Sequence, residues 1–302
     1  MYPYLIDTEF FKLPSYAVFM WLGAIAFICV LVWIVEKREK TDRKTVNRIL
    51  IITAIGAIAL YAFAFFFNSL FHSLEEGELV LGGITWLGGV LGAFPLTVFL
   101  LHKFCPRIKG NALFYFNLLV PAIALGHAFG RVGCFFAGCC YGKPTDAFLG
   151  VQFPLLNEKV YPTQLFEAVF EFAFFGVCIG FYKKLREHFL EGYLFGYGVF
   201  RFLLEFMRGD DRGGLGIFLS PSQVICLLML IAGVLLILYR KGMIFKTLYK
   251  KAAAWRAESE KYGVYLREDV AVALKKLKGL QQDGLLTSEE YESYKKQLEE
   301  KL

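Results

Sequence analysis

The chain has 302 residues, of which 57% are hydrophobic, 17% are aromatic and only 20% are charged. Soluble domains carry about a quarter charged residues, so this composition and the mean hydropathy of +0.50 exclude an ordinary soluble domain and indicate a protein surrounded largely by lipid. The formal net charge is +6, and charged residues crowd the stretch from Arg240 onward. Such asymmetry marks a domain boundary and not a nucleic-acid-binding surface.

The N-terminus does not have the form of a secretory signal peptide. No basic segment precedes the first apolar run, and the first residues include Asp7 and Glu9. We therefore expect the first apolar segment to remain in the mature protein as a membrane span.

Seven segments approach the roughly 20 apolar residues that a helix needs to cross a hydrocarbon core of about 30 Å. The sixth is short and polar, and we include it because the loops on either side require a crossing between them. The sequence therefore predicts an all-α polytopic membrane protein of about seven transmembrane helices. The segments are 16–35, 49–67, 82–101, 113–136, 164–182, 192–207 and 219–239.

Basic residues alternate between the loops that join these segments. The first, third and fifth loops and the stretch after the last segment are rich in Lys and Arg. The second loop instead holds Glu75, Glu76 and Glu78, and the sixth holds Asp210 and Asp211 beside two arginines. Because basic loops stay in the cytoplasm, the pattern predicts an outer N-terminus and a cytoplasmic C-terminus.

The tail divides into two further regions after the transmembrane domain of residues 1–240. Residues 241–271 are predicted to form a basic juxtamembrane helix or linker, and residues 272–302 a short helical hairpin. Thr287 followed by Glu290 is a capping box that starts the second helix, and its apolar residues Tyr291, Tyr294 and Leu298 share one face. The hairpin resembles a short helical module appended to many bacterial proteins. Two interpretations stay open, a solvated tail and an element for self-association or docking.

Three polar stripes interrupt the apolar segments. An ionisable side chain at membrane depth costs about 2.5–3.5 kcal/mol on insertion scales, so it normally faces the bundle interior. Spacings of three and four residues place the members of each stripe on one helix face. The stripes are His127, Arg131 and Cys134; Gln164, Glu167 and Glu171; and Arg201, Glu205 and Arg208.

A single stripe has a structural explanation, because an Arg–Glu pair such as Arg201 with Glu205 neutralises itself within one helix. Three stripes in one small bundle are better explained by a site. Guanidinium groups bind phosphate through two parallel hydrogen bonds. The stripes therefore predict a cavity for an anionic head group.

Glycines and cysteines add weaker signals. The Gly88-x-x-x-Gly92 spacing is typical of close helix packing. Cys134, Cys139 and Cys140 cluster in the sequence, and with His127 they permit a soft-metal site. Their spacing is not that of a standard zinc pair, so we favour a local disulfide or small apolar fillers and predict no metal and no other cofactor.

Four segments resemble the prolipoprotein diacylglyceryl transferase family over about residues 14–240. Residues 126–142, Gly-His-Ala-Phe-Gly-Arg-Val-Gly-Cys-Phe-Phe-Ala-Gly-Cys-Cys-Tyr-Gly, are similar to its Gly-Arg-x-Gly-Asn-Phe signature. Residues 161–168, Tyr-Pro-Thr-Gln-Leu-Phe-Glu-Ala, are similar to its His-Pro-Ser-Gln-Leu-Tyr-Glu segment. Residues 197–208 are similar to its Tyr-Gly-x-x-Arg-Phe-x-x-Glu-Phe-x-Arg segment, and residues 219–223 to the stretch that opens its last span.

The resemblance implies an enzyme of the bacterial inner membrane that transfers a diacylglyceryl group from phosphatidylglycerol to the lipobox cysteine of a prolipoprotein, and releases glycerol phosphate. By the same resemblance, Arg131 and Arg201 hold the phosphate and Glu205 orients Arg201. The implied substrate-binding residues are Tyr16, Gly88, Gly89, Gly130, Gly133, Cys134, Gly142, Gln164, Glu167, Tyr197 and Arg208.

The sequence departs from the family pattern at four positions. Leu87 stands where the family has a histidine, Cys134 where it has an asparagine, and Cys139 where it has a glutamate. His127 stands at a position that is often glutamine or small, and its ordinary pKa near 6.5 makes it a candidate base for the acceptor thiol. We therefore add His127 to the predicted catalytic residues.

Three other functions remain as alternatives. A divergent paralogue would use the same lipid donor with a different acceptor. A phospholipid-binding scaffold would have no need to bury both arginines and Glu205. A transporter would be expected to show internal repeats, and the sequence has none.

Overall fold

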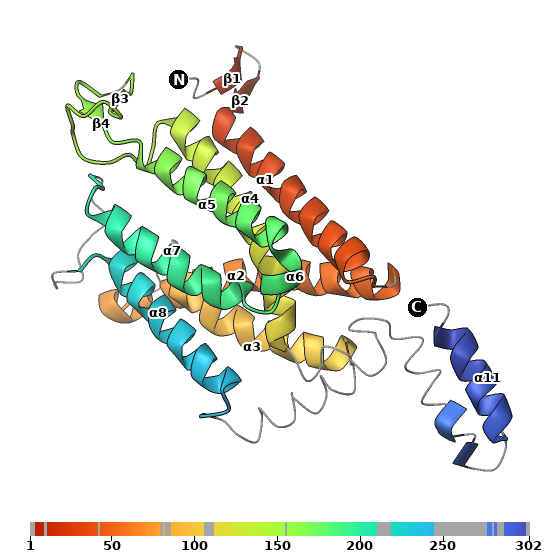
Figure 1. Ribbon diagram of the computed structural model, residues 1–302. Helices are drawn as coiled ribbons and strands as arrows, with labels where there is room; N and C mark the ends of the chain where they lie inside the picture. Colours follow the sequence, from red (N-terminus) through yellow and green to blue (C-terminus); the bar gives the residue numbers. More distant parts are fainter. Residues whose placement is uncertain are drawn as a thin grey trace. The chain divides into compact units, whose positions relative to one another are not determined.

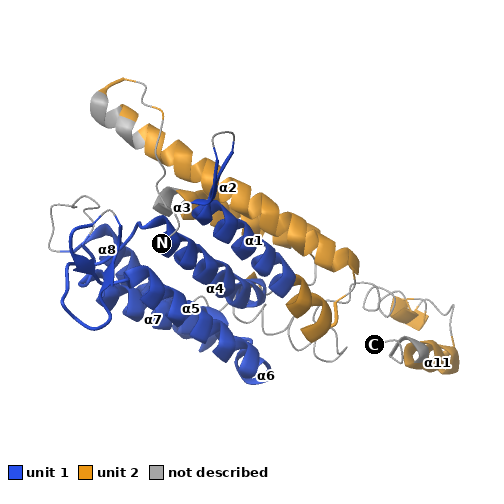
Figure 2. Cartoon of the chain, turned by 90° about the horizontal axis from the view of Figure 1, so that it is seen from above, with its two compact units in different colours: residues 1–31, 113–249 blue, residues 32–112, 250–302 orange. Residues whose placement is uncertain are grey.

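The computed structural model describes residues 4–8, 11–41, 43–78, 81, 86–105, 112–154, 156–209, 219–244, 277–279, 281–282 and 287–299. These residues belong to two compact units, one of residues 1–31 and 113–249 and the other of residues 32–112 and 250–302 (Figure 2). The loop residues Asp210 and Asp211, and nearly all of the predicted segment 241–271, lie outside the described residues.

The described chain is mostly helical (Figure 1), which confirms the predicted all-α polytopic membrane fold. Two small antiparallel hairpins accompany the helices, β1 (Tyr4–Asp7) with β2 (Lys12–Pro14) and β3 (Val151–Gln152) with β4 (Lys159–Val160). The helices are α1 (Ser15–Trp33), the π-helical turn η1 (Ile34–Arg38), α2 (Arg43–Glu76), α3 (Trp86–Phe104), α4 (Ala112–Ala137), α5 (Thr163–Gly180), α6 (Tyr182–Leu185), α7 (Phe189–Glu205), α8 (Pro221–Arg240) and α11 (Ser288–Glu299).

Among the described residues, five helical stretches are long and apolar enough to cross a membrane. They are Ser15–Arg38, Arg43–Leu70, Ala112–Ala137, Thr163–Gly180 and Pro221–Arg240. The third and sixth predicted segments correspond to α3, of which Gly92–Leu101 is a shorter apolar stretch, and to α7, which has 17 residues. The protein is therefore a multi-pass membrane protein, and the count of seven spans and the orientation stay predictions.

In the first unit, α1 and α4 approach closely because glycines face one another. A Cβ atom at Gly23 would lie 2.8 Å from the carbonyl oxygen of Gly126. A Cβ at Gly133 would lie 3.0 Å from the Cβ of Phe19. The rings of Phe19 and Phe136 stack at a centroid distance of 5.0 Å beside this contact. Small residues at the crossing thus let the two backbones meet, as is common for membrane helices.

The last span begins at a complete capping box. The hydroxyl of Ser220 accepts from the backbone N–H of Gln223, and the Gln223 side chain accepts from the backbone N–H of Ser220. Pro221 occupies the first helical position, where its missing N–H has no cost. This cap also places the Ser220 hydroxyl beside the end of α7.

In the second unit, α2 and α3 pack through Gly89 and Gly92. A Cβ at Gly89 would lie 2.6 Å from the carbonyl oxygen of Leu60 and 3.1 Å from the Cβ of Ala64. Gly92 faces the ring of Phe63, which leaves no room for a side chain. The predicted close-packing role is therefore confirmed for Gly92, while the surroundings of Gly88 lie outside the described part of the chain.

We expect Gly89→Ala to lower the free energy of unfolding in detergent by about 1–3 kcal/mol, since a methyl group must push the two backbones apart. The matched control is Gly176→Ala on α5, where nothing lies within 4 Å of the added Cβ. That control should be neutral or stabilising, because alanine favours helix over glycine. Equal thermal unfolding of Gly89→Ala and the control would show that α2 and α3 do not need the contact.

The tail helix α11 starts as the sequence predicts. The Thr287 backbone N–H and hydroxyl both donate to Glu290 Oε2, at 3.0 and 2.9 Å, and the Thr287 hydroxyl accepts from the Glu290 N–H. The donated bonds, first the one from the Thr287 backbone, hold the pKa of Glu290 below its ordinary value. The capping box is therefore confirmed, and the first helix of the hairpin is described only at residues 277–279 and 281–282.

Candidate functional site

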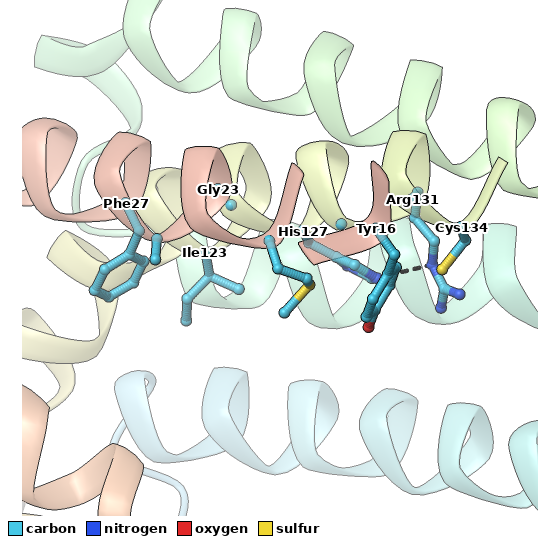
Figure 3. Close-up of a pocket in the computed structure, with 11 residues that line it drawn as sticks. Tyr16, Gly23, Phe27, Ile123, His127, Arg131 and Cys134 are labelled. Atoms are coloured by element: carbon cyan, nitrogen blue, oxygen red, sulfur yellow. Dashed lines mark hydrogen bonds between the residues drawn. The ribbon is translucent and has the colours of Figure 1, made fainter. Parts of the chain in front are cut away.

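A cavity of about 550 Å³ lies along the contact between α1 and α4 within the first unit (Figure 3). Its volume is within the range of small-molecule sites. The lining comes from two helix faces, namely Tyr16, Met20, Gly23, Ala24 and Phe27 of α1 and Ile123, Gly126, His127, Gly130, Arg131 and Cys134 of α4.

The cavity is polar at one end and apolar at the other. Phe27 and Ile123 lie at one end, and Arg131 and Cys134 lie at the opposite end, with His127 between them (Figure 3). This arrangement follows from the sequence of α4, where the polar positions of the predicted stripe come about one to three turns after Ile123. A cavity of this kind suits an amphiphile whose charged group meets the guanidinium.

His127 and Arg131 form one hydrogen-bonded unit. The Arg131 Nε–H donates to His127 Nε2 at 3.1 Å, so this ring nitrogen acts as the acceptor. The other ring nitrogen, Nδ1, lies 2.8 Å from Oε1 of Glu171 and donates to it. Both nitrogens of the ring are therefore engaged.

Two fully buried glutamates of α5 lie behind this unit. Glu167 Oε1 forms an ion pair with Arg131 Nη2 at 2.9 Å and accepts a hydrogen bond from the hydroxyl of Tyr197 at 2.6 Å. Glu171 Oε1 receives the hydroxyl of Tyr193 at 2.9 Å. The two tyrosine rings stack at a centroid distance of 5.1 Å, one helical turn apart on α7. Three helices thus converge on two carboxylate oxygens, which holds the Arg131 side chain in one orientation.

A second guanidinium extends the network toward the end of α7. Arg201 Nε lies 3.8 Å from Glu167 Oε1, and its Nη1 pairs with Glu205 on the same helix. The predicted i,i+4 pair of Arg201 and Glu205 is therefore confirmed. Ser222 accepts from Arg201 at 3.3 Å, and Ser220 donates to Glu205 at 2.8 Å. The start of α8 thus fixes both members of the pair.

Charge is balanced across the polar stripes. Glu167, Glu171 and Glu205 bring three carboxylates, and Arg131, Arg201 and Arg208 bring three guanidiniums. The three negative and three positive charges cancel. Compensation of this kind is needed because an uncompensated charge is costly to bury. An anion that enters the cavity would meet Arg131, the arginine that lines it.

The segment after α4 folds back over the end of the helix. Gly138 and Cys140 have positive φ angles of 71° and 63°. Two side chains of α5 hold the segment in place, since the hydroxyl of Thr163 donates to the Cys140 carbonyl at 2.9 Å and the Gln164 amide donates to the Cys139 carbonyl at 2.7 Å. The fold brings the sulfur atoms of the predicted cysteine cluster within 4.8 Å of one another.

All seven cysteines are described, and each is a thiol in this structure. Within the cluster, Cys139 is exposed, whereas Cys134 and Cys140 are partly buried. Partial burial raises the pKa of the Cys139 thiol, and the neighbouring Cys140 thiol adds to that rise.

The predicted site residues fall into three groups. Tyr16, His127, Gly130, Arg131 and Cys134 line the cavity. Behind it lie residues of the hydrogen-bonded network, namely Glu167, Tyr197, Arg201 and Glu205. The remaining ones take part in packing or belong to the second unit, namely Gly133, Gly142, Gln164 and Arg208, and Gly88 and Gly89 on α3.

The packing group has specific contacts. Gly142 forms an antiparallel bridge to Arg208, and a Cβ at Gly142 would lie 2.6 Å from the carbonyl oxygen of Met207. Gln164 is fully buried and contacts the cysteine segment, not the cavity. These residues therefore shape the chain next to the cavity.

The prediction of site residues omitted Glu171, Tyr193, Ser220 and Ser222. The signal for Glu171 was its place in a predicted stripe, and the signal for Tyr193 was its position one turn before Tyr197 on the same face. The signal for the two serines was their place in residues 219–223, the segment similar to the family stretch that opens the last span. Their contacts depend on the approach of α8 to α7.

A model of the family described as prolipoprotein diacylglyceryl transferase matches residues 3–239 of the chain. The chain belongs to the prolipoprotein diacylglyceryl transferase family. A phosphatidylglycerol–prolipoprotein diacylglyceryl transferase of Clostridium tetani is 31% identical over 247 residues, which cover 78% of this chain and 96% of that protein. The corresponding protein of Finegoldia magna is 30% identical, covering 76% and 94%. A second such transferase of Clostridium perfringens is 36% identical, covering 55% and 64%.

Membership in this family confirms the resemblance that the motifs predict. The match ends at residue 239, just before the predicted boundary at 240, so the tail of residues 241–302 lies outside the matched region. Among the residues that depart from the family pattern, His127 and Cys134 line the cavity, and Cys139 lies in the segment next to it. The surroundings of Leu87 lie outside the described part.

Proposed function

We propose that this protein transfers a diacylglyceryl group from phosphatidylglycerol to the cysteine thiol of prolipoproteins, in the bacterial inner membrane. The observation that supports this proposal most directly is the cavity between α1 and α4, which is apolar at one end and carries Arg131 at the other. The polarity of the cavity matches a phospholipid whose phosphate meets a guanidinium. The relatives of the protein in its family are named as phosphatidylglycerol–prolipoprotein diacylglyceryl transferases.

In this proposal Arg131 binds the phosphate of the donor lipid. Glu167 and His127 hold its side chain from behind, at 2.9 and 3.1 Å. A guanidinium fixed in this way needs no rearrangement when negative charge grows on the leaving phosphate. Arg201 is paired with Glu205 and also lies next to Glu167, the carboxylate that holds Arg131. It therefore adds a second positive charge near the phosphate-binding guanidinium.

The role of His127 follows from its contacts. Both ring nitrogens are engaged, one by Arg131 and one by Glu171, so the proposal assigns His127 to positioning the guanidinium. Its prediction as the base for the acceptor thiol is a competing hypothesis, and one pair of variants separates the two roles.

The function is tested with the full-length protein in detergent, phosphatidylglycerol and a lipobox peptide. The readouts are the mass of the peptide and the release of glycerol phosphate. Transfer to the peptide supports the proposal. Binding of phosphatidylglycerol without transfer to this peptide would favour a different acceptor or a lipid-binding scaffold.

We expect His127→Ala to lower kcat/KM by about 10–100-fold, the range found when a supporting hydrogen-bond partner is lost. His127→Gln should stay within several-fold of the wild type, because the amide can accept from Arg131 and donate to Glu171. If His127 is instead the base, both variants lose activity equally, by about 10²–10⁴-fold. The same peptide assay over a range of pH distinguishes these results.

The tail is proposed as a second site, one that binds a protein partner. Tyr294 of α11 is exposed, at 48% of its surface, one turn after Tyr291 on the same helix face. An exposed aromatic of this kind supports self-association or docking through the C-terminal hairpin. This partner role is separate from the chemistry, since the cavity uses residues of the first unit only.

A further inference from the structure

Three cysteines form a cluster that the proposed transfer does not yet use. The sulfur atoms of Cys134, Cys139 and Cys140 all lie within 4.8 Å of one another. In a tetrahedral zinc site the Zn–S distance of about 2.3 Å sets the sulfurs about 3.8 Å apart. Small rotations of three side chains would therefore suffice to bring the sulfurs around one ion.

The structure holds this cluster in place. The positive φ angles of Gly138 and Cys140 turn the chain back, and the Cys139 N–H donates to the Cys134 carbonyl at 3.1 Å. Gln164, which is fully buried, and Thr163 fix the carbonyl groups of Cys139 and Cys140. One thiol on α4 and two thiols in the turn that follows it are thus held at fixed positions, and supporting hydrogen bonds of this kind are typical of a ligand set.

The cluster also reaches the cavity. Cys134 lines its polar end together with Arg131, one turn away on α4 (Figure 3). Cys139 is exposed, so a fourth ligand has access. Three thiolates and a divalent cation carry a net charge of −1, which the neighbouring guanidinium of Arg131 would offset.

We propose that Cys134, Cys139 and Cys140 bind one soft divalent cation, Zn²⁺, whose open fourth position takes the acceptor thiol. The role rests on the proposed transfer to a cysteine thiol. Three protein ligands with one open position are the arrangement of a catalytic zinc site, and a thiol that binds such an ion loses its proton. The ion would thereby activate the acceptor thiol.

The transfer step balances with these parts. The acceptor thiol releases its proton to solvent when its sulfur binds the ion. The sulfur lone pair then forms a C–S bond to the carbon of the diacylglyceryl group that is joined to the phosphate of phosphatidylglycerol. The C–O bond to the phosphate breaks, and its electron pair leaves with the oxygen of glycerol phosphate, next to Arg131.

Metal binding is tested without any activity. Full-length protein, purified with reductant, is titrated with Zn²⁺ against a chromophoric chelator, and with Co²⁺ for its thiolate charge-transfer absorption. We expect one ion per chain, lost in Cys139→Ser/Cys140→Ser. The ion should be retained when Cys29, Cys105, Cys178 and Cys226 are all changed to serine. The proposal is overturned if the reduced wild type binds no ion, which is the result that a disulfide or filler role requires. It is also overturned if the double variant binds the ion as the wild type does.

The role of the ion is tested by spectrum and by rate. The Co²⁺ absorption should change when the lipobox peptide is added, and should not change with a peptide whose cysteine is serine. At pH 7 the double variant should transfer about 30-fold more slowly, since about 3% of a thiol of pKa 8.5 is ionised, and the gap should close near pH 9.5. If the wild type transfers the diacylglyceryl group to the peptide and the double variant does so at the same rate at pH 7, the proposed activation of the thiol by the ion is wrong. If the wild type itself fails to transfer, the proposed function fails while the ion count still decides the metal site.

Discussion

Arg131→Lys is expected to lower kcat/KM for phosphatidylglycerol by about 10²–10³-fold, the loss found when one preorganised donor to a developing anion is removed. Lysine keeps the positive charge beside Glu167, which lies 2.9 Å from the arginine, so the protein should still fold. It cannot form two parallel hydrogen bonds to a phosphate, nor donate to His127 as the guanidinium does.

The measurement is the peptide assay with varied lipid concentration, beside thermal unfolding in detergent. Arg186→Lys is the matched control, because Arg186 belongs to the first unit but does not line the cavity, and it should keep wild-type activity. Activity of Arg131→Lys within three-fold of the wild type would show that the phosphate does not depend on this guanidinium.

Glu167→Leu is expected to lower the free energy of unfolding by about 3–5 kcal/mol, the cost of removing one partner from a buried ion network. Glu167 is fully buried, and its Oε1 atom receives Arg131 Nη2 and the hydroxyl of Tyr197 and lies 3.8 Å from Arg201 Nε. Without it, two guanidiniums of like charge face each other with no carboxylate between them.

Glu167→Gln should be intermediate, because the amide oxygen still accepts from Tyr197 while the negative charge is lost. Glu158→Gln, at an exposed position before β4, is the control and should leave stability unchanged. The experiment is denaturant unfolding in mixed micelles, followed by tryptophan fluorescence. A Glu167→Leu protein as stable as the control would mean that the two arginines are compensated elsewhere.

Much of the fold and of the site follows from local patterns. A run of about 20 apolar residues can only cross lipid as a helix, since every backbone group must find its hydrogen bond within the segment. Spacings of three and four residues place His127, Arg131 and Cys134 on one face in any α-helix, and the structure has all three lining one cavity. The capping box of Thr287 and Glu290 is equally local and is confirmed.

Contacts between helices could not be predicted from the same patterns. Glu171 was recognised as a buried polar residue, yet its partner was not, because the pairing of His127 with Glu171 depends on how α4 and α5 pack. Ser220 and Ser222 enter the network only because α8 begins beside the end of α7. The sequence predicts His127 as a base, whereas both of its ring nitrogens have partners that only helix packing supplies.

The amino-acid sequence by itself therefore determined that this protein is a helical membrane protein with arginines and carboxylates on inward faces, and its motifs indicated the family. These properties depend on composition and on helical periodicity, which are local. Only the tertiary structure decided which carboxylate meets which guanidinium and where the cavity lies. Those features depend on distances between segments far apart in the chain, and such distances are set by packing and not by sequence spacing.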